Sequence, residues 1–504
     1  MSQLLAIDLG TSSVKVLCLT ETGQTLSQGS AEYPIQRPQP EQAEQAPAEW
    51  WQATISATQQ CLAGRADKSQ PISAIGLSGQ MHGTVLLDQA DHLLCPAIIW
   101  PDQRSQPQVQ EITARIGAAH LIEVTGSPVA TGFQAATLRW MQQERPNLWR
   151  QVKHVLLPKD YLRWRLTGQF ATDPSDASGT LLCDVRRRDW SAELLATLEI
   201  APNLLPQVQP ATAIAGQLIA EAAAQLKLPT GTPVVTGAAD TACSILGAGV
   251  VDDQTLLLSL SSGGQLLVPV RQVQVDRSGR LHTFCGALTP SPEQTGWYQM
   301  GAILSAGLAL RWLRDNIFAL SGADAYTRMT DWAATAPLGA KGLLFLPYLM
   351  GERTPHLDPQ ARGIFLGLKA GHGRAELVRA VMEGVALACY DAFAALAEVG
   401  ARPQRIVLAG GGAQSELWQQ IMADVFNLPL QPLISGEQSA RGAALLAGEG
   451  LGQFQAGAAA QTWASYGPVR EPNQANHHHF QELLHIFRQA YQKHREDFQQ
   501  LAKL

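Results

Sequence analysis

The residues that could do chemistry begin at positions 6–15. There the sequence AIDLGTSSVK places one carboxylate, Asp8, before a run of small and hydroxylated side chains. Residues 4–9 and 14–19 are apolar enough to form two strands joined by this tight turn. Backbone N–H groups and hydroxyls in such a turn can hold phosphate oxygens. Asp8 then ends its strand where a phosphate-bound Mg2+ needs an oxygen partner. An ordinary hairpin with a solvated aspartate is the alternative.

The same pattern recurs half a chain later. Residues 259–264, SLSSGG, can be laid over residues 8–13, DLGTSS, and each run follows one Leu-rich strand and precedes another. Two such hairpins predict a duplicated domain with one phosphate-binding turn in each lobe. Chance similarity between two Leu-rich hairpins is the alternative.

Two further polar segments fall at predicted strand ends, where open α/β sheets bind their ligands. A strand at residues 72–77 runs into the loop SGQMHG, which contains Met81 and His82. A strand at residues 234–236 leads to Asp240, the first residue of an apolar helix. From there a carboxylate on a rigid element can be aimed at a substrate hydroxyl. An ordinary N-cap aspartate is the alternative.

Trp100, Asp102 and Arg104 occupy alternate positions in the segment PAIIWPDQRS. On an extended backbone the three side chains would share one face. An aromatic ring beside a carboxylate and a guanidinium suits a polyhydroxylated ligand, because the ring covers carbon while the charged groups bind hydroxyls. A surface ion pair beside a core tryptophan is the alternative.

A glycine-rich turn follows the predicted strand at residues 405–409 and precedes a helix at residues 416–426. Three successive glycines, residues 410–412, let the backbone approach a flat or phosphorylated ligand at the helix N-terminus. The sequence contains no GxxxxGK[ST], which disfavours a Walker-type nucleotide fold. The consecutive histidines 477–479 cannot face one way, so we expect an exposed polar tract and no metal site there.

The bulk composition limits the class of protein. A chain of 504 residues is too long for one compact core and predicts two or three domains. A hydrophobic content of 46%, a net charge of −6 and no basic run argue against nucleic acid or an anionic membrane as a partner. Seven dispersed cysteines without a CxxC pair favour free thiols in a reducing compartment. With no leader or membrane-spanning pattern recognised, we expect a cytoplasmic protein.

The elements that must position these residues are of mixed type, and the fold class is α/β. We expect a meander of strands over residues 4–33, helices at residues 50–63, 158–168, 377–396 and 440–447, mainly helix between residues 108 and 199, an ordered loop at residues 345–368, and a polar terminal helix at residues 482–504. The expected division is an N-terminal lobe at residues 1–250, a C-terminal lobe at residues 251–450 and a helical tail at residues 451–504.

Together these segments resemble the FGGY family of carbohydrate kinases over residues 4–448. The run GxFxGL at residues 363–368, followed by ELVRAVME at residues 376–383, is similar to the family signature. EQAPAEWW (44–51), SGQMHG (78–83), WPDQR (100–104) and FLPYLMGERTPH (345–356) are similar to segments of members that act on D-xylulose. The resemblance implies two actin-like, ribonuclease-H-like lobes with an interlobe active-site cleft.

The resemblance also implies an activity: transfer of the γ-phosphoryl group of ATP to the C5 hydroxyl of D-xylulose, with Mg2+ as cofactor. Asp240 is the implied general base and Asp8 supports the metal, with both carboxylates next to it. The expected sugar contacts are Met81, His82, Trp100, Asp102, Arg104 and Thr241. The expected ATP contacts are Gly10, Thr11, Ser12, Lys15, Ser261, Ser262, Gly263, Gly410, Gly411, Gly412 and Gln414. Sugar and ATP are the expected partners, and a homodimer is left open.

Three positions depart from the family pattern. Ser261 stands where a glycine is usual, so backbone strain is expected there. Thr241 follows Asp240 where members that act on xylulose often carry Asn or Gln. That difference keeps another ketose, a polyol or a sugar acid (ribulose, gluconate or a tetritol) as an alternative acceptor. Arg441 replaces an apolar residue. A non-kinase actin-like ATPase switch is a more distant alternative.

Overall fold

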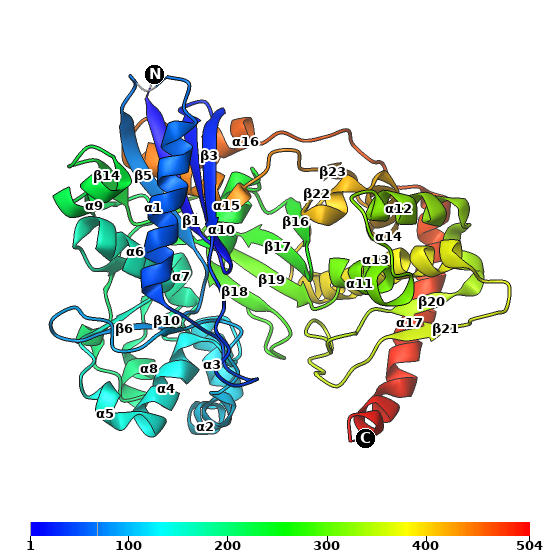
Figure 1. The fold of residues 1–504 in the computed structure, drawn as a ribbon. Helices are drawn as coiled ribbons and strands as arrows, with labels where there is room; N and C mark the ends of the chain where they lie inside the picture. The colour runs from blue at the N-terminus through cyan, green and yellow to red at the C-terminus, as the bar shows by residue number, and fades with distance from the viewer. Residues whose placement is uncertain (1, 68, 504) are drawn as a thin grey trace.

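Two lobes, each built on a mixed β-sheet, make up the protein, as Figure 1 shows for a computed structural model that describes residues 2–67 and 69–503. The first sheet has the order β13 (Ile214–Gln217), β14 (Pro233–Val235), β5 (Ile72–Gly79), β1 (Gln3–Leu9), β2 (Ser13–Thr20), β3 (Thr25–Glu32), with β15 (Ala238–Ala239) beside β5. The second has the order β18 (His282–Cys285), β19 (Trp297–Ile303), β17 (Gly264–Val270), β16 (Thr255–Leu260), β22 (Arg405–Ala409), β23 (Leu430–Pro432).

The two sheets repeat one topology. In the first, β1 pairs antiparallel with β2 and β2 with β3, while β5 pairs parallel with β1 on its other side. In the second, β16, β17 and β19 form the same antiparallel meander, and β22 pairs parallel with β16. Both predicted hairpins are therefore present. The second tip is one residue shorter, because Leu9 pairs with Val14 whereas Leu260 pairs with Gly264.

Each sheet is covered on both faces, which explains its near-continuous apolar strands. In β1, Leu4 and Ala6 face a core that lies between the two lobes, whereas Leu5, Ile7 and Leu9 face an outer core. The alternation follows from the two-residue period of a strand. The outer core of the first lobe includes α1 (Pro47–Ala63), α6 (Pro158–Thr167) and α9 (Ala220–Leu226). That of the second lobe includes α11 (Gly307–Trp312), α13 (Arg374–Glu398), α14 (Glu416–Phe426) and α17 (Gln474–Leu501).

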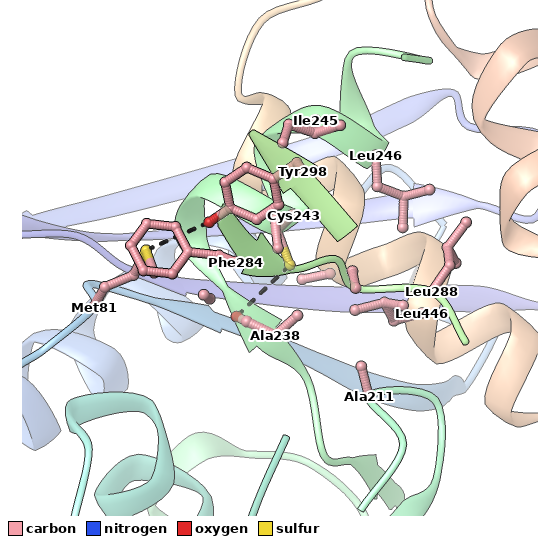
Figure 2. Close-up of a cluster of buried hydrophobic side chains, with 14 of the residues drawn as sticks. Met81, Ala211, Ala238, Cys243, Ile245, Leu246, Phe284, Leu288, Tyr298 and Leu446 are labelled. Atoms are coloured by element: carbon pink, nitrogen blue, oxygen red, sulfur yellow. Dashed lines mark hydrogen bonds between the residues drawn. The ribbon is translucent and has the colours of Figure 1, made fainter. Parts of the chain in front are cut away.

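Two helices fill the core between the sheets, α10 (Asp240–Gly247) and α15 (Gln438–Gly450). They pack on one another, and α15 also packs on β1 and β5 of the first sheet. A helix close to the C-terminal end of the chain therefore belongs to the N-terminal sheet, as does the following α16 (Ala456–Trp463), drawn in orange in Figure 1. Figure 2 shows part of this core, where Tyr298 of β19 points its hydroxyl at the sulfur of Met81. Leu446 of α15 belongs to the same core.

The remaining α-helices and β-strands are divided between the two lobes. In the first lobe they are β4 (Glu44–Gln45), β6 (Val85–Leu87), β7 (Ala97–Ile98), α2 (Gln106–Ile116), α3 (Ala118–Thr125), α4 (Gln134–Glu144), α5 (Pro146–Trp149), β8 (His154–Leu156), β9 (Ala171–Thr172), α7 (Pro174–Ser178), β10 (Cys183–Asp184), β11 (Asp189–Trp190), α8 (Ala192–Thr197) and β12 (Gln207–Val208). In the second they are α12 (Ala325–Thr335), β20 (Leu344–Leu346) and β21 (Ile364–Leu366).

The terminal helix differs from its prediction. α17 begins at Gln474, eight residues before the expected start, because Asn473 caps it by accepting the N–H groups of Ala475 and Asn476. The three histidines lie inside this helix. Only His478 is exposed; His477 contacts the Asp424 carbonyl and His479 is half-buried. The prediction of an exposed tract was therefore wrong for two of the three.

One helix of the described chain, α13, is long and apolar enough to cross a membrane by length and composition alone. Its most apolar window is 78% buried inside the protein, as in the core helix of a globular lobe.

Candidate active site

Three parallel strands of the first sheet bring Asp8 and Asp240 to the same edge. Asp8 in β1 lies opposite Ser78 in β5, and Ser78 lies opposite Ala238 in β15. Asp240 follows two residues after Ala238 and begins α10. Because the carboxyl ends of parallel strands meet at one edge, the two carboxylates come together although 231 residues separate them in the sequence.

Both carboxylates line one cavity of about 210 Å3 between the lobes. The first lobe contributes Asp8, Gly10, Asp240, Thr241 and Ser244, and α15 contributes Gln438 and Ser439. The second sheet closes the other side with Leu257, Ser259, Gln265, Leu267 and Ala409. The position equivalent to Asp8 in the second hairpin, Ser259, thus faces the same space.

Burial raises the pKa of both carboxyl groups, and the charge of Asp8 adds to the shift of Asp240. Burial and, to a smaller extent, the charge of Asp8 raise the pKa of Asp240 to about 7. Hydrogen bonds from Thr241 oppose this shift. Burial also raises the pKa of Asp8, against hydrogen bonds from Ser439 and Ser78 and the charge of Lys15. A carboxylate with a pKa near neutral pH can take up a proton during a reaction.

Each carboxylate is held by a neighbour. Ser439 donates its hydroxyl to Asp8 Oδ1 at 2.9 Å and also contacts the Ser78 hydroxyl. Thr241 donates its backbone N–H to Asp240 Oδ1 at 2.6 Å and its hydroxyl to the same oxygen at 3.2 Å. The second oxygen of Asp240 is therefore the one left for a ligand. Thr241, predicted as a sugar contact, lines the cavity and also orients the carboxylate.

A larger cavity of about 740 Å3 lies in the second lobe. Its lining includes five predicted ATP contacts: Ser261, Ser262, Gly411, Gly412 and Gln414. It also includes α12, the Arg311 side chain and the first residues of α14. Arg311 donates to the Ser262 hydroxyl at 3.4 Å, which brings a cation to the second hairpin tip.

The two cavities adjoin because the same two strands contribute to both. At the end of β16, Ser259 lines the smaller cavity and Ser261 the larger; at the end of β22, Ala409 lines the smaller and Gly411 the larger. A ligand bound in the large cavity can thus extend past the second hairpin tip toward Asp8 and Asp240.

Gly410 and Gly412 of the glycine-rich turn leave no room for a Cβ atom. Gly410 has φ of 81°, and a Cβ atom there would lie 2.4 Å from the Leu260 carbonyl oxygen. Gly263 also packs tightly, against the Ile303 carbonyl. Ser261, by contrast, does not have a positive φ, so the expected strain was wrong. Its N–H bonds the Gly263 carbonyl at 2.9 Å in an ordinary turn.

In the first tip, Gly10 lines the small cavity, and its N–H bonds the Ser13 carbonyl. Thr11 accepts a hydrogen bond at 2.9 Å from the indole of Trp100, which places that predicted sugar contact beside the tip. Ser12 is exposed, and its carbonyl accepts the Tyr33 N–H. Lys15 pairs with Glu437 at 2.7 Å.

Met81 and His82 follow β5, and neither lines the cavity that holds Asp240. His82 Nδ1 lies 2.6 Å from the Gly179 carbonyl oxygen, so this nitrogen carries the proton and Nε2 is the acceptor. Burial lowers the pKa of His82 to about 4, which keeps the ring neutral. The ring lies 4.0 Å from that of Phe133. A neutral histidine with an acceptor nitrogen suits a sugar hydroxyl.

The expectation that Trp100, Asp102 and Arg104 share a face was wrong. Trp100 is 43% exposed whereas Asp102 is 1% exposed, because the chain turns after Ile99 instead of running extended. Asp102 accepts the Ala43 N–H at 2.7 Å and pairs with Arg104 at 2.8 Å, and Arg104 also pairs with Glu44. These charges satisfy one another inside the protein.

Sequence reasoning missed Ser439, Gln265 and Arg311. Ser259 had a signal, since it aligns with Asp8 in the two hairpins. Ser439 had none, because it reaches Asp8 across 431 residues of sequence. Arg441, whose role was open, donates to the Gly23 carbonyl and the Thr25 hydroxyl and so ties α15 to the turn between β2 and β3.

A magnesium ion fits this donor set. In residues 2–67 and 69–503 no group of three or more His, Cys, Asp or Glu side chains could hold a metal ion alone. Mg2+ typically takes only one or two protein carboxylates and completes its shell with phosphate and water. Asp8 and Asp240 supply two hard oxygen donors whose mutual repulsion a divalent cation would relieve.

The fold and this site define a two-lobed sugar kinase. Residues 3–247 match the N-terminal domain of the FGGY family of carbohydrate kinases, and residues 271–450 match its C-terminal domain. The chain therefore belongs to the FGGY family of carbohydrate kinases and is an ATP-dependent sugar kinase.

Individual relatives show which sugar kinases the chain is similar to. The chain is 39% identical over 444 residues to the xylulose kinase of Escherichia coli (strain K12), covering 88% of this chain and 89% of that protein. It is 33% identical over 454 residues to the gluconokinase of Bacillus subtilis (strain 168), covering 88% and 87%. The crystal structure of xylulose kinase from Rhodospirillum rubrum superposes with a TM-score of 0.91 at 30% identity, covering 99% of this chain and 100% of that one.

Proposed function

We propose that the protein transfers the γ-phosphoryl group of ATP to the C5 hydroxyl of D-xylulose, giving D-xylulose 5-phosphate and ADP. The observation that carries the proposal is the cavity shared by Asp8 and Asp240, next to a larger cavity lined by the second hairpin tip and the glycine-rich turn. The choice of sugar is supported by the relatives named xylulose kinase.

ATP occupies the larger cavity in this proposal. Its volume of about 740 Å3 lies in the range of small-molecule sites. The base and ribose lie against Gly411, Gly412 and Gln414, and the two glycines allow close approach because they lack side chains. The triphosphate then points along Ser261 and Ser262, where amides, hydroxyls and the Arg311 guanidinium face its oxygens. The first tip, with Gly10, Thr11 and Ser12, meets the terminal phosphate from the opposite lobe.

Asp8 is the residue that would hold Mg2+ together with the phosphates, and Asp240 lines the same cavity. The ion supplies neutralisation of the charge on the phosphate oxygens. Ser439 fixes Asp8 in place for this role through its hydrogen bond to Oδ1. Lys15 and Glu437 form an ion pair beside it and adjust the local charge.

Asp240 accepts the proton of the attacking hydroxyl. As the C5 oxygen bonds to the γ-phosphorus, the bond from phosphorus to the β,γ-bridging oxygen breaks, ADP leaves with that oxygen, and the hydroxyl proton moves to Asp240. Thr241 holds Oδ1, so Oδ2 is the acceptor. Closure of the lobes excludes water, which would otherwise compete with the sugar as acceptor.

Met81, His82 and Trp100 bind the carbon chain and the remaining hydroxyls of the sugar. His82 offers Nε2 as an acceptor, and the Met81 side chain covers carbon. Asp102 and Arg104 support these sugar-binding residues without contacting the sugar, since their charges are already paired.

One observation favours a sugar acid as the second candidate acceptor. Arg353 of the second lobe acts electrostatically on the rings of His82 and His282, and Arg353 itself is exposed. A guanidinium in that position could pair with a carboxylate such as that of gluconate.

A panel of acceptors in an assay coupled to ADP release tests the proposal. D-xylulose, D-ribulose, L-ribulose, gluconate and glycerol are compared at equal concentration with ATP and Mg2+. The highest kcat/KM is expected for D-xylulose. A higher value for gluconate would select the second candidate, and ADP release that no acceptor accelerates would refute a sugar kinase.

A further inference from the structure

Five fully buried charged side chains lie behind the segment that carries Asp240. Lys159, Asp160 and Arg163 come from α6, Asp173 caps α7, and Asp176 lies within α7. All five side chains have no exposed surface. The phosphoryl transfer proposed above uses none of them.

The charges of this buried cluster pair internally. Lys159 Nζ lies 2.7 Å from Asp160 Oδ1, 3.2 Å from Asp173 Oδ1 and 3.3 Å from Asp176 Oδ2. Arg163 lies 3.0 Å from Asp160. Burial disfavours the charged ammonium, but the three carboxylates together raise the pKa of Lys159 and keep it charged.

Side chains of the cluster, together with Ser175, hydrogen-bond the backbone just before Asp240. Arg163 donates to the Thr236 carbonyl at 3.0 Å, and Lys159 Nζ lies 3.5 Å from the same oxygen. Ser175 accepts the Ala239 N–H at 2.9 Å. The Ser175 hydroxyl is in turn fixed by donating to Asp173. Both ends of residues 236–239 are therefore tied to buried charges.

The middle of the same segment is fixed as well. Gly237 has φ of 75°, and a Cβ atom there would lie 2.3 Å from the Leu77 carbonyl oxygen, so the backbone is pressed against β5. Cys243 donates its thiol to the Ala238 carbonyl at 3.7 Å, as Figure 2 shows. Each of residues 236–239, directly before Asp240, is therefore fixed by a backbone hydrogen bond or by tight packing.

Stability alone does not account for such a cluster. Buried ion pairs lose about as much in desolvation as they gain in attraction, and well-packed apolar residues often replace them without loss of stability. Charged donors and acceptors do, however, fix backbone groups in one geometry. A base displaced by about 1 Å can lose a hundredfold in rate.

We propose that the buried cluster, acting through Ser175 and the Thr236 carbonyl, is a positioning device that holds Asp240 in its catalytic orientation. The inference rests on the proposed function, because it assigns the rigidity of residues 236–239 to the base at residue 240. Lys159, Arg163, Asp173 and Ser175 are positioning residues; none lines the cavity that holds Asp240.

Ser175→Ala tests the device with the smallest change, since it removes only one hydroxyl, which accepts the Ala239 N–H and donates to Asp173. Thr180→Val is the matched control: its buried hydroxyl also accepts one backbone N–H, that of Leu182, and donates to the Ala177 carbonyl, away from residues 236–239. We expect Ser175→Ala to lower kcat about tenfold or more with KM for ATP within twofold. Ser175→Thr, which keeps a hydroxyl, should retain most of the normal kcat. Both hydroxyl deletions should lower Tm alike.

Asp240→Asn separates the inference from the proposed function. If the device acts through the base, Ser175→Ala costs no further activity in the Asp240→Asn background. Equal losses of kcat in Ser175→Ala and Thr180→Val, or a tenfold loss that persists without the Asp240 carboxylate, would overturn the inference while Asp240→Asn still shows its own large loss of rate. Normal turnover of Asp240→Asn would refute the base itself, and the inference with it.

Discussion

Replacing Gly76 with alanine tests whether the packing of α15 on β5 holds the active-site residues in place. Gly76 lies in β5 beneath α15, and a Cβ atom there would lie 1.9 Å from the Ala443 carbonyl oxygen. On its other side α15 is equally tight against α10, since a Cβ atom at Gly442 would lie 2.0 Å from the Cys243 carbonyl oxygen. Helix α15 therefore has no free space in which to adjust.

The expected cost follows from this geometry. Ordinary contact begins near 3.4 Å, so α15 must move roughly 1.5 Å, and overpacking of a well-packed core costs about 3 kcal/mol. For a lobe of this size that corresponds to a fall in Tm of about 6–12 °C. Because α15 carries Ser439, the same shift loosens Asp8, and kcat should fall with Tm.

Thermal unfolding followed by circular dichroism, together with steady-state kinetics, measures both effects. Gly371→Ala is the matched control, because a Cβ atom there meets nothing within 4 Å and its φ is not positive. If Gly76→Ala and Gly371→Ala gave the same Tm and kcat, the backbone-to-backbone packing of α15 on β5 would be refuted.

Two further outcomes follow from buried carboxyl groups. Burial raises the pKa of Glu352 to about 8 from an ordinary 4.5. The contribution of Glu352 to stability is therefore present below pH 4.5 and is lost as pH rises through about 8, so Tm should fall across this window. Glu352→Gln should flatten the fall. If Tm of Glu352→Gln followed the same pH profile as that of the unaltered protein, the raised pKa would be contradicted. Asp102→Asn removes one partner of a buried pair with Arg104 and should cost about 3 kcal/mol of stability with KM for the sugar nearly unchanged. A large rise in KM with normal Tm would instead make Asp102 a direct sugar contact.

Local patterns predicted much of the fold. The hairpins at Asp8 and Ser259, the helix that begins at Asp240 and the glycine turn at Gly410 were each visible as an apolar run followed by small or polar residues, and the structure contains all of them. The two hairpins also gave the duplicated topology. These features depend on neighbours in the sequence, so they can be read from it.

Features set by distant contacts could not be predicted. The bond from Ser439 to Asp8 depends on a late helix returning to the first sheet. The segment PKDYLRWRLTG was recognised as a core helix, but the burial of Lys159 and Arg163 depends on Asp173 and Asp176, which follow on a separate helix. Alternation at Trp100 and Asp102 failed because a turn, which spacing alone does not reveal, replaced an extended backbone.

The most direct test of the account is single-turnover phosphorylation of D-xylulose by Asp240→Asn, with sugar binding measured in parallel. Loss of a general base should lower the rate of transfer by about 10²–10⁴ while the Kd for D-xylulose stays within a fewfold. Asp497→Asn, an exposed aspartate of α17, should match the unaltered protein. Transfer by Asp240→Asn at close to the normal rate would contradict the central claim that this carboxylate receives the proton of the sugar hydroxyl.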